Sequence, residues 1–393
     1  MTTTPRPALI PLLTAGFVTV LVGFTSSYPL VLQAGQALGL TRDQLVLMTS
    51  AFALGTGLTT LLPSLWLRMP IVTAWSTPGA ALLAVSLQGV ELPEAVGAFV
   101  ICGALLFFVG MTPLFGSVLH YIPQSLASAL LAGVLVKFGL EAFASLRIGF
   151  AFVAPMLATY LIARRFISIY AVPLVLVVGV VAAALAGALH WTTTAAGSFP
   201  RIVAVAPTFS WTTLIGIALP LFVVTMASQN LPGVAVLRTH GYAAPVSRLV
   251  ALTGLATMVL APFGVFALNL AAITAALCMG DNVHPDPGQR YRAAVVAGSV
   301  YCLVGVAGIW VVDTFTAFPR PLVIAIAGFA LLPTIARGLS QALEQPAERE
   351  SALITFLVTA SGLELGGIGA AFWGVVLGIV SRWLLLPSFA PKP

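Results

Sequence analysis

The sequence has very little charge. Asp, Glu, Lys and Arg make up 7% of the 393 residues, whereas hydrophobic residues make up 60%, and the mean hydropathy is +1.08. A typical soluble domain carries about 25% charged residues. The composition therefore excludes a water-soluble globular protein. It predicts an all-α polytopic membrane protein, because helices satisfy their own backbone hydrogen bonds inside a lipid bilayer.

Residues that hold metals and cofactors are also scarce. The few candidates lie in apolar runs or in loops without ligand spacing: Cys102, Cys278, Cys302, His120, His190, His240 and His284. No GxxxxGK[ST] phosphate loop, no aspartate cluster of a prenyltransferase and no protease constellation occurs, so we expect no metal, no cofactor and no enzyme. The basic residues are scattered singly, and the net charge of +6 therefore does not indicate nucleic-acid binding.

Loop signals divide the chain into about fourteen apolar segments. They begin near Leu9, Gln44, Pro70, Ala95, Pro123, Ile148, Ile169, Trp211, Val246, Phe263, Tyr291, Pro321, Ala352 and Ala370. With a cytoplasmic N-terminus, twelve basic residues fall inside and four outside. The inner set is Arg6, Arg68, Arg164, Arg165, Arg238, Arg248, Arg290, Arg292, Arg337, Arg349, Arg382 and Lys392, and the outer set is Arg42, Arg147, Arg201 and Arg320. The positive-inside rule thus predicts that both termini lie in the cytoplasm, which for a bacterial protein means the inner membrane.

The segment from Met69 to Leu87 is nearly long enough to span a bilayer, but Thr77-Pro78-Gly79 interrupts it. β-Branched and aromatic residues before the proline favour a short strand. Thr77 is a good N-cap and Pro78 suits the first helical position, so a half-helix is expected to begin near the middle of the membrane. Its unpaired N–H groups form a positive end suited to an anion, as in the binding sites of carriers.

A weak internal repeat of opposite orientation relates the two halves of the chain. Seven residues separate Pro70 from Thr77, and seven separate Pro262 from Asn269, which we expect to cap a second half-helix over the following run LAAITAAL. A polar pair precedes a proline at matching depth in the first and eighth segments, as Ser26-Ser27-Tyr28-Pro29 and Gln229-Asn230-Leu231-Pro232. Seven segments per half require an inverted second copy.

Four stretches resemble the benzoate:proton symporter (BenE) family: TAWSTPGAALLA (73–84), FVVTMASQNLPGVAVLRTHGY (222–242), APFGVFALNLAAITAALC (261–278) and SGLELGGIGAAFWG (361–374). The similarity extends over nearly the whole chain. It implies the uracil-transporter fold, a seven plus seven inverted repeat with a core domain (1–120 and 211–312) and a gate domain (121–210 and 313–393). It also implies a substrate held between the half-helices of spans 3 and 10, and a homodimer through the gate domain.

Related nucleobase carriers have carboxylates in spans 8 and 10, where this chain offers Gln229, Asn230 and Asn269. A nucleobase is therefore disfavoured. Two facing helix N-termini supply about one positive charge, which matches a monocarboxylate, and aromatic side chains can sandwich a ring. The candidate binding residues are Ser26, Ser27, Tyr28, Trp75, Ser76, Thr77, Gln229, Asn230, Phe266 and Asn269, with Phe24 as a further ring.

Structural roles are the alternatives for these residues. In the structural alternative, the hydroxyls of Ser26 and Ser27 donate to backbone carbonyls one helical turn back and do not contact the substrate. Trp75 would then contribute to packing and not to binding. The amides of Gln229 and Asn230 need partners inside hydrocarbon, which are either the substrate or another helix.

Three ionisable residues are expected inside spans, where such residues suggest function. Lys137 and Glu141 are four residues apart, so they form either a self-satisfying ion pair or a proton relay. Glu364, in the thirteenth segment, is the first proton-coupling candidate; the alternative is a position near the outer surface, where a carboxylate needs no special role. The proton-coupling candidates are therefore Glu364, Glu141 and Lys137.

The sequence thus predicts secondary active transport, in which benzoate or a similar aromatic monocarboxylate enters with a proton by alternating access. Importing a monoanion against an inside-negative potential costs about 2.3 kcal/mol per 100 mV, and a co-transported proton cancels this cost. The alternatives are a carrier of the same fold for another small anion or a nucleobase, and an uncoupled anion channel. The partners expected are the carboxylate, the proton and the lipid bilayer.

Overall fold

A computed structural model describes residues 9–112, 123–191 and 202–385. Some predictions concern positions outside these residues, namely the domain boundary between 120 and 121 and the side of the membrane or loop position of Arg6, His120, Arg201 and Lys392. The first half contains α1 (Leu9–Ala37), α2 (Arg42–Leu67), β1 (Thr73–Trp75), α3 (Thr77–Ser86), α4 (Leu92–Met111), α6 (Gln124–Ala144), α7 (Phe150–Phe166), the short η2 (Ser168–Tyr170) and α8 (Ala171–Leu185).

The second half begins with a distorted helix, made of α9 (Trp211–Thr213), the π-helical η3 (Leu214–Ala218), α10 (Leu219–Thr225), the π-helical η4 (Met226–Asn230) and α11 (Leu231–Thr239). It continues with α12 (Val246–Leu260), β2 (Leu268–Leu270), α13 (Ile273–Ala276), α14 (Tyr291–Val306), α15 (Gly308–Thr316), α16 (Arg320–Ala342), η7 (Pro346–Glu348), α17 (Arg349–Ser361) and α18 (Ala370–Leu385). Twelve of the fourteen predicted segment starts lie within three residues of a helix start.

Within the described ranges, eight helices are long and apolar enough to cross a membrane. A ninth span results if the pair Pro287–Val306 and Gly308–Thr316, bent by 72°, counts as one. Other apolar segments form shorter helices, such as α3 and α18. The two predicted broken segments are the ones that contain the strands β1 and β2.

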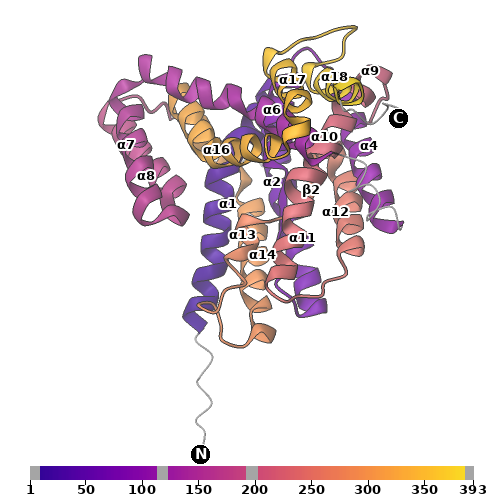
Figure 1. Cartoon of the computed structure of the whole chain (residues 1–393). Coiled ribbons are helices and arrows are strands. Elements are labelled where there is room, and N and C mark those ends of the chain that lie inside the picture. Colours follow the sequence, from indigo (N-terminus) through magenta and orange to yellow (C-terminus); the bar gives the residue numbers. More distant parts are fainter. Residues whose placement is uncertain (1–8, 113–122, 192–201, 386–393) are drawn as a thin grey trace, which may run out of the picture.

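One group of helices packs around the strands. α2 lies along α14, α4 lies along α12, and α1 contacts both α3 and α14 (Figure 1). Glycines allow the closest approaches, because a Cβ on Gly57 would lie 2.8 Å from the carbonyl oxygen of Gly298, and a Cβ on Gly103 would lie 2.9 Å from that of Gly254. Small residues are the usual means of close helix packing in membranes.

The other helices pack mainly among themselves. α6 contacts α16 and α17, α7 contacts α8, and α17 contacts α18. In Figure 1, α7 and α8 stand beside α1 on the left, and α17 and α18 lie at the top. α16 contacts α1 as well as α7 and α8, so it lies where the two groups meet.

The strands β1 and β2 pair antiparallel, with Ala74 opposite Asn269. Ala271 donates its N–H to the carbonyl of Val72 (2.9 Å), and Ser76 donates its N–H to the carbonyl of Ala267 (3.0 Å). Ala267 adopts a left-handed backbone (φ 44°), which is strained for a residue with a side chain. The pairing satisfies backbone groups that no helix covers, in a part of the molecule that is almost completely buried.

The structure corrects two predicted caps. Ser76, not Thr77, is the N-cap of α3, since its Oγ accepts the N–H of Gly79 (3.0 Å) and Thr77 is the first helical residue. Asn269 caps no helix, because it lies inside β2 and its Nδ2 donates to the carbonyl of Ala267 (3.0 Å). The run after it forms only the four residues of α13, without a side-chain cap.

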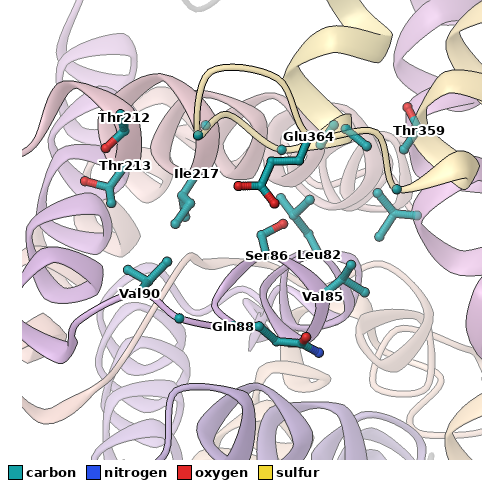
Figure 2. Close-up of a pocket in the computed structure, with 18 of the residues that line it drawn as sticks. Leu82, Val85, Ser86, Gln88, Val90, Thr212, Thr213, Ile217, Thr359 and Glu364 are labelled. Atoms are coloured by element: carbon teal, nitrogen blue, oxygen red, sulfur yellow. The ribbon is translucent and has the colours of Figure 1, made fainter.

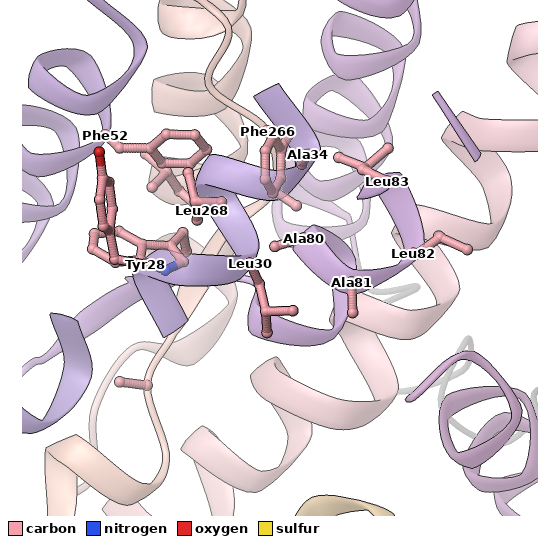
Figure 3. Close-up of a cluster of buried hydrophobic side chains, with 14 of the residues drawn as sticks. Tyr28, Leu30, Ala34, Phe52, Ala80, Ala81, Leu82, Leu83, Phe266 and Leu268 are labelled. Carbon is pink, nitrogen blue, oxygen red and sulfur yellow. The ribbon is translucent and has the colours of Figure 1, made fainter. Parts of the chain in front are cut away.

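A buried apolar cluster supports the strands and α3 (Figure 3). The ring of Phe52 meets that of Phe266 edge-on, with centroids 4.8 Å apart. Tyr28 shares a hydrogen bond with Thr49 (2.9 Å between the oxygens) and is 1% exposed. The other residues labelled in the view are Leu30, Ala34, Ala80, Ala81, Leu82, Leu83 and Leu268.

Candidate functional site

A cavity of about 330 Å³ lies between the two groups of helices. One wall comes from α1, β1, the start of α3, η4, α13 and α14, and the other from α7, η2, α8 and α16. Five of the ten predicted binding residues line it: Ser26, Ser27, Trp75, Thr77 and Gln229. Their positions in the sequence span about half of the chain, and the strand pair brings them together.

The two serines of α1 do bond to the backbone one turn back, as the structural alternative required. The hydroxyls of Ser26 and Ser27 both donate to the carbonyl of Gly23, at 3.2 and 2.6 Å. Ser27 Oγ also accepts the indole N–H of Trp75 (2.8 Å). Trp75 is 2% exposed, so this bond fixes the ring at the floor of the cavity.

The amides of the eighth segment have different positions. η4 is a π-helical turn that precedes Pro232, which cannot donate to the helix, and such turns are frequent at functional sites. Gln229 lines the cavity and makes no hydrogen bond with the described residues. Asn230 is fully buried, and its Oδ1 accepts the N–H of Leu270 (3.0 Å), so its partner is the strand β2.

The remaining five predicted residues do not line this cavity: Tyr28, Ser76, Asn230, Phe266 and Asn269. All are buried behind it. Ser76 accepts the hydroxyl of Thr225 (3.0 Å) in addition to capping α3. Asn269 keeps a buried Oδ1 without a hydrogen-bond partner among the described residues. Phe24 stacks on Tyr28 with ring centroids 4.6 Å apart and meets Trp75 edge-on at 5.4 Å.

Sequence reasoning missed Tyr301 of α14. Its side chain is 98% buried, and its ring meets that of Trp75 edge-on with centroids 6.0 Å apart. Tyr301 lines the cavity, and its hydroxyl makes no hydrogen bond with a described residue. The hydroxyl lies close to α1, since a Cβ on Gly23 would be 2.6 Å from it. A hydroxyl that borders a cavity and has no partner in the protein is available to water or to a ligand.

The cavity is electropositive. None of its lining residues is Asp or Glu, whereas Arg164 of α7 and Arg337 of α16 both line it. Neither arginine forms an ion pair with a described residue, and both are exposed. Hydroxyls, an amide, aromatic rings and unpaired cations together suit a small anion with an apolar body.

Glu364 lies outside any helix, which corrects its expected place in a span. It is exposed, in the loop between α17 and α18, because Gly362, Gly366 and Gly367 adopt positive φ angles that end α17 and turn the chain. Its side chain lines a second hollow, of about 470 Å³, together with Lys137 and the C-terminal part of α3. Figure 2 shows the Glu364 carboxylate pointing into this hollow above Ser86 and Leu82.

Lys137 and Glu141 form no ion pair within the described residues, so the expected self-satisfying pair is wrong. Glu141 is exposed, and both side chains border a third hollow, also of about 470 Å³, beside Gln33 and Arg320. The two side chains remain unpaired because both border the hollow, and charges that are solvated gain little free energy from forming an ion pair. α3 therefore has the 330 Å³ cavity at its first turn and the other two hollows at its last turn.

Comparisons with solved structures show the fold. The chain matches SLC26A9 with a TM-score of 0.62 at 15% identity. The match covers 96% of this chain and 65% of the SLC26A9 chain, so this protein spans about two thirds of the length of SLC26A9. It matches the transmembrane domain of the cyanobacterial bicarbonate transporter BicA with a TM-score of 0.60 at 13% identity, covering 95% and 97%. The protein is thus an all-α polytopic membrane protein with the fold of these two.

Comparisons of sequence show the family. The chain is 45% identical over 370 residues to the inner membrane protein YdcO of Escherichia coli, covering 94% of each. It is 36% identical over 372 residues to the benzoate membrane transport protein of Acinetobacter baylyi, covering 95% of this chain and 94% of that protein. The model of the benzoate membrane transport family, BenE, matches residues 7–384. The chain therefore belongs to this family of membrane transport proteins, as its four motifs predict.

Proposed function

We propose that this protein is a secondary active transporter that takes up benzoate or a similar aromatic monocarboxylate together with a proton. The observation that carries the proposal is the 330 Å³ cavity beside the β1–β2 pair, which has hydroxyl, amide, aromatic and arginine groups but no carboxylate in its lining. The volume suits a small ligand. A relative 36% identical to the chain is named as a benzoate transport protein, which supports the same substrate here.

The binding mode follows from the two kinds of lining group. The carboxylate would accept hydrogen bonds from Thr77, Gln229 and the unpaired hydroxyl of Tyr301, near the first turn of α3. The aromatic ring would rest against the edges of Trp75 and Tyr301. Five buried residues behind the cavity would support it by holding the strands, α3 and the aromatic rings in place. They are Tyr28, Ser76, Asn230, Phe266 and Asn269.

A seven plus seven inverted repeat is consistent with the helix contacts. If the fourteen segments are numbered in order, α2, α4, α12 and α14 fall in segments 2, 4, 9 and 11. Exchanging the two halves turns segments 2 and 11 into segments 9 and 4, so the contact of α2 with α14 corresponds to the contact of α12 with α4. In the same way, the contact of α7 with α8 corresponds to the contact of α17 with α18. The antiparallel strands relate segments 3 and 10 in the same way.

We assign the core domain to 1–120 and 211–312 and the gate domain to 121–210 and 313–393, although the last boundary falls inside α15. The cavity lies between helices of these two domains. Sliding of one domain against the other would open the site first to one side and then to the other. A homodimer through the gate domain belongs to the same proposal.

Charge balance favours proton coupling. No carboxylate lines the cavity, so the proton would enter on the substrate's own carboxyl group or through Glu364, Glu141 or Lys137 in the hollows at the other end of α3. The location would be the bacterial inner membrane, as the name of the Escherichia coli relative indicates, with both termini in the cytoplasm.

The experiment is uptake of radiolabelled benzoate into proteoliposomes with an imposed inward proton gradient, repeated after a protonophore has collapsed it. Liposomes without protein are the control, because neutral benzoic acid crosses lipid unaided. The proposal expects saturable accumulation above this control that disappears with the gradient. Saturable uptake that is equally fast with and without the proton gradient would reject proton coupling. Uptake that does not saturate with benzoate concentration would indicate a channel. Folded protein that gives no uptake above the control would reject benzoate as substrate.

A further inference from the structure

The two walls of the 330 Å³ cavity differ in chemistry. The wall from α1, α3 and η4 offers hydroxyls and one amide, of which Ser26, Thr77 and Gln229 are examples. The opposite wall, from α7, η2, α8 and α16, brings both cations, Arg164 and Arg337. These two are exposed, so they mark the end at which the cavity reaches the surface.

Several other arginines are engaged in structure. Arg42 binds both carboxylate oxygens of Asp313, at 2.8 and 2.7 Å. Arg290 is 5% exposed and donates to the carbonyls of Met279 (2.8 Å) and His284 (2.7 Å), and Arg382 donates to Glu348 (2.8 Å).

In contrast, Arg164 and Arg337 make no hydrogen bond and no ion pair with any described residue. They come from helices whose positions are more than 150 residues apart in the chain, yet they line one cavity without a carboxylate. Their charges are therefore available to a ligand.

Low-dielectric walls around a recess focus the field of charges at its entrance and raise the local concentration of the opposite ion. The guanidinium fork also matches the two oxygens of a carboxylate. Because no acidic lining residue cancels the two charges, a monoanion at the mouth would be held in a recess rather than on an open surface.

We infer that Arg164 and Arg337 form a second, outer anion site at the mouth of the cavity, which receives a small monocarboxylate before or after it occupies the deeper site at Thr77 and Tyr301. The inference deepens the proposed function and rests on it for the identity of the carboxylate. It makes the two sides of the membrane unequal, since the hollows at the other end of α3 combine their cations with carboxylates: Lys137 with Glu94 and Glu364 in one, and Lys137 and Arg320 with Glu141 in the other.

The test uses Arg164→Gln, Arg337→Gln and the double variant, with Arg165→Gln as the matched control. Arg165 loses the same charge one residue away, but its guanidinium lies over the ring of Phe166, 5.6 Å from the centroid, and it does not line the cavity. The half-saturation concentration for benzoate is measured in right-side-out and in inverted membrane vesicles, at ionic strengths of about 0.01 and about 1 M.

At low salt, each single variant is expected to raise the half-saturation concentration about threefold and the double variant about tenfold, on one side of the membrane only. At high salt the Debye length falls to about 3 Å, and the differences should shrink towards the wild type. An equal effect of Arg165→Gln, an equal effect on both sides, or an effect that persists at high salt would overturn the inference.

A second readout does not depend on benzoate transport. A fluorophore is attached to Thr274→Cys, which lines the cavity, in a background where Cys102, Cys278 and Cys302 are replaced by alanine. Iodide should quench it less in the Arg164→Gln, Arg337→Gln double variant, whereas quenching by neutral acrylamide should not change. Arginine-dependent iodide quenching without benzoate transport would reject the proposed function alone. If benzoate is transported but iodide quenches the wild type and the double variant equally, the outer anion site is rejected and the proposed function stands.

Discussion

Tyr301 presents a hydroxyl to the cavity. Its ring is packed against Trp75, but this hydroxyl makes no hydrogen bond with a described residue. We predict that Tyr301→Phe raises the half-saturation concentration for benzoate about tenfold and leaves the unfolding temperature nearly unchanged, because a hydrogen bond to a charged group contributes about 1.5 kcal/mol. Initial uptake rates in proteoliposomes, measured over a range of benzoate concentrations, check this.

Tyr28→Phe provides the matched control, since it removes the same atom from a tyrosine that does not line the cavity. The hydroxyl of Tyr28 bonds to Thr49, so its loss should lower the unfolding temperature and change the half-saturation concentration much less than Tyr301→Phe does. If the two variants gave the same change in half-saturation, Tyr301 would have no direct contact with the substrate.

The start of α3 is the element that positions the first wall of the cavity. Ser76 caps it through the N–H of Gly79 and also accepts the hydroxyl of Thr225 on α10. We predict that Ser76→Ala destabilises the protein by about 1 to 2 kcal/mol, because it removes a cap and leaves buried donors unpaired. Thermal unfolding in detergent measures this as a lower transition temperature.

Thr77→Val separates capping from ligand contact. Thr77 lines the cavity, and its side chain makes no hydrogen bond with the described residues, so this change should spare the unfolding temperature and weaken benzoate uptake. An equal loss of stability in Thr77→Val and Ser76→Ala would contradict the assignment of the cap to Ser76.

Local chemistry explains which parts of this region could be predicted. The break at Pro78 follows from the missing N–H of proline, which acts in any surroundings. The choice between Ser76 and Thr77 as cap depends on strand pairing and on Thr225, which is 149 residues away from Ser76. Asn269 was expected to cap a helix because its own sequence suits a cap, but pairing with Ala74 draws it into a strand.

A second element-scale feature is an ion pair with a buried carboxylate and a partly exposed arginine, which ties η7 to α6 and α18. Ser125 donates its hydroxyl to Glu348 (2.5 Å), and Arg382 donates to the same carboxylate (2.8 Å). Burial alone would raise the pKa of Glu348, but these bonds and the charge of Arg382 outweigh it and hold the pKa below the ordinary value of 4.5. The interaction therefore stabilises the folded state above pH 4.5, and this contribution is lost as the pH falls through the lowered pKa.

We predict that Glu348→Gln lowers the unfolding temperature at pH 7 and that the difference from wild type narrows as the medium becomes more acidic than pH 4.5. Unfolding in detergent is followed over a series of pH values. Glu350→Gln is the control, because Glu350 is exposed and forms no ion pair with a described residue. A difference for Glu348→Gln that stays constant down to pH 3 would show that lost packing, rather than lost charge, causes the destabilisation.

For the whole molecule, hydropathy and loop signals located nearly all helix starts, because the lipid environment imposes a length and an apolar composition on each span. Neither the second wall of the cavity nor Tyr301 in the first wall was predicted. Arg164, Arg337 and Tyr301 are far apart in sequence, and the expected site drew only on the first, third, eighth and tenth segments. Which side chains share a cavity depends on how α14 and α16 pack against α1 and how α7 packs against α16, and no single segment contains that information.

The last prediction concerns how the molecule moves. The 330 Å³ cavity and the hollow lined by Ser86 lie at opposite ends of α3, so a carrier with alternating access should expose them to opposite sides of the membrane, and not both at once. In the cysteine-free background, Thr274→Cys and Ser86→Cys should react with an impermeant maleimide from opposite faces of the same vesicles. A channel would instead let the reagent reach both positions from one face.

Benzoate adds the direction of change to this test. If the substrate shifts the population of the two states, an inward proton gradient with benzoate should change the two labelling rates in opposite senses, one rising as the other falls. Benzamide, which lacks the charge, is the control and should leave both rates unchanged. Rates that rise or fall together would mean that benzoate alters general accessibility rather than the balance between two states, and domain movement would then no longer explain transport.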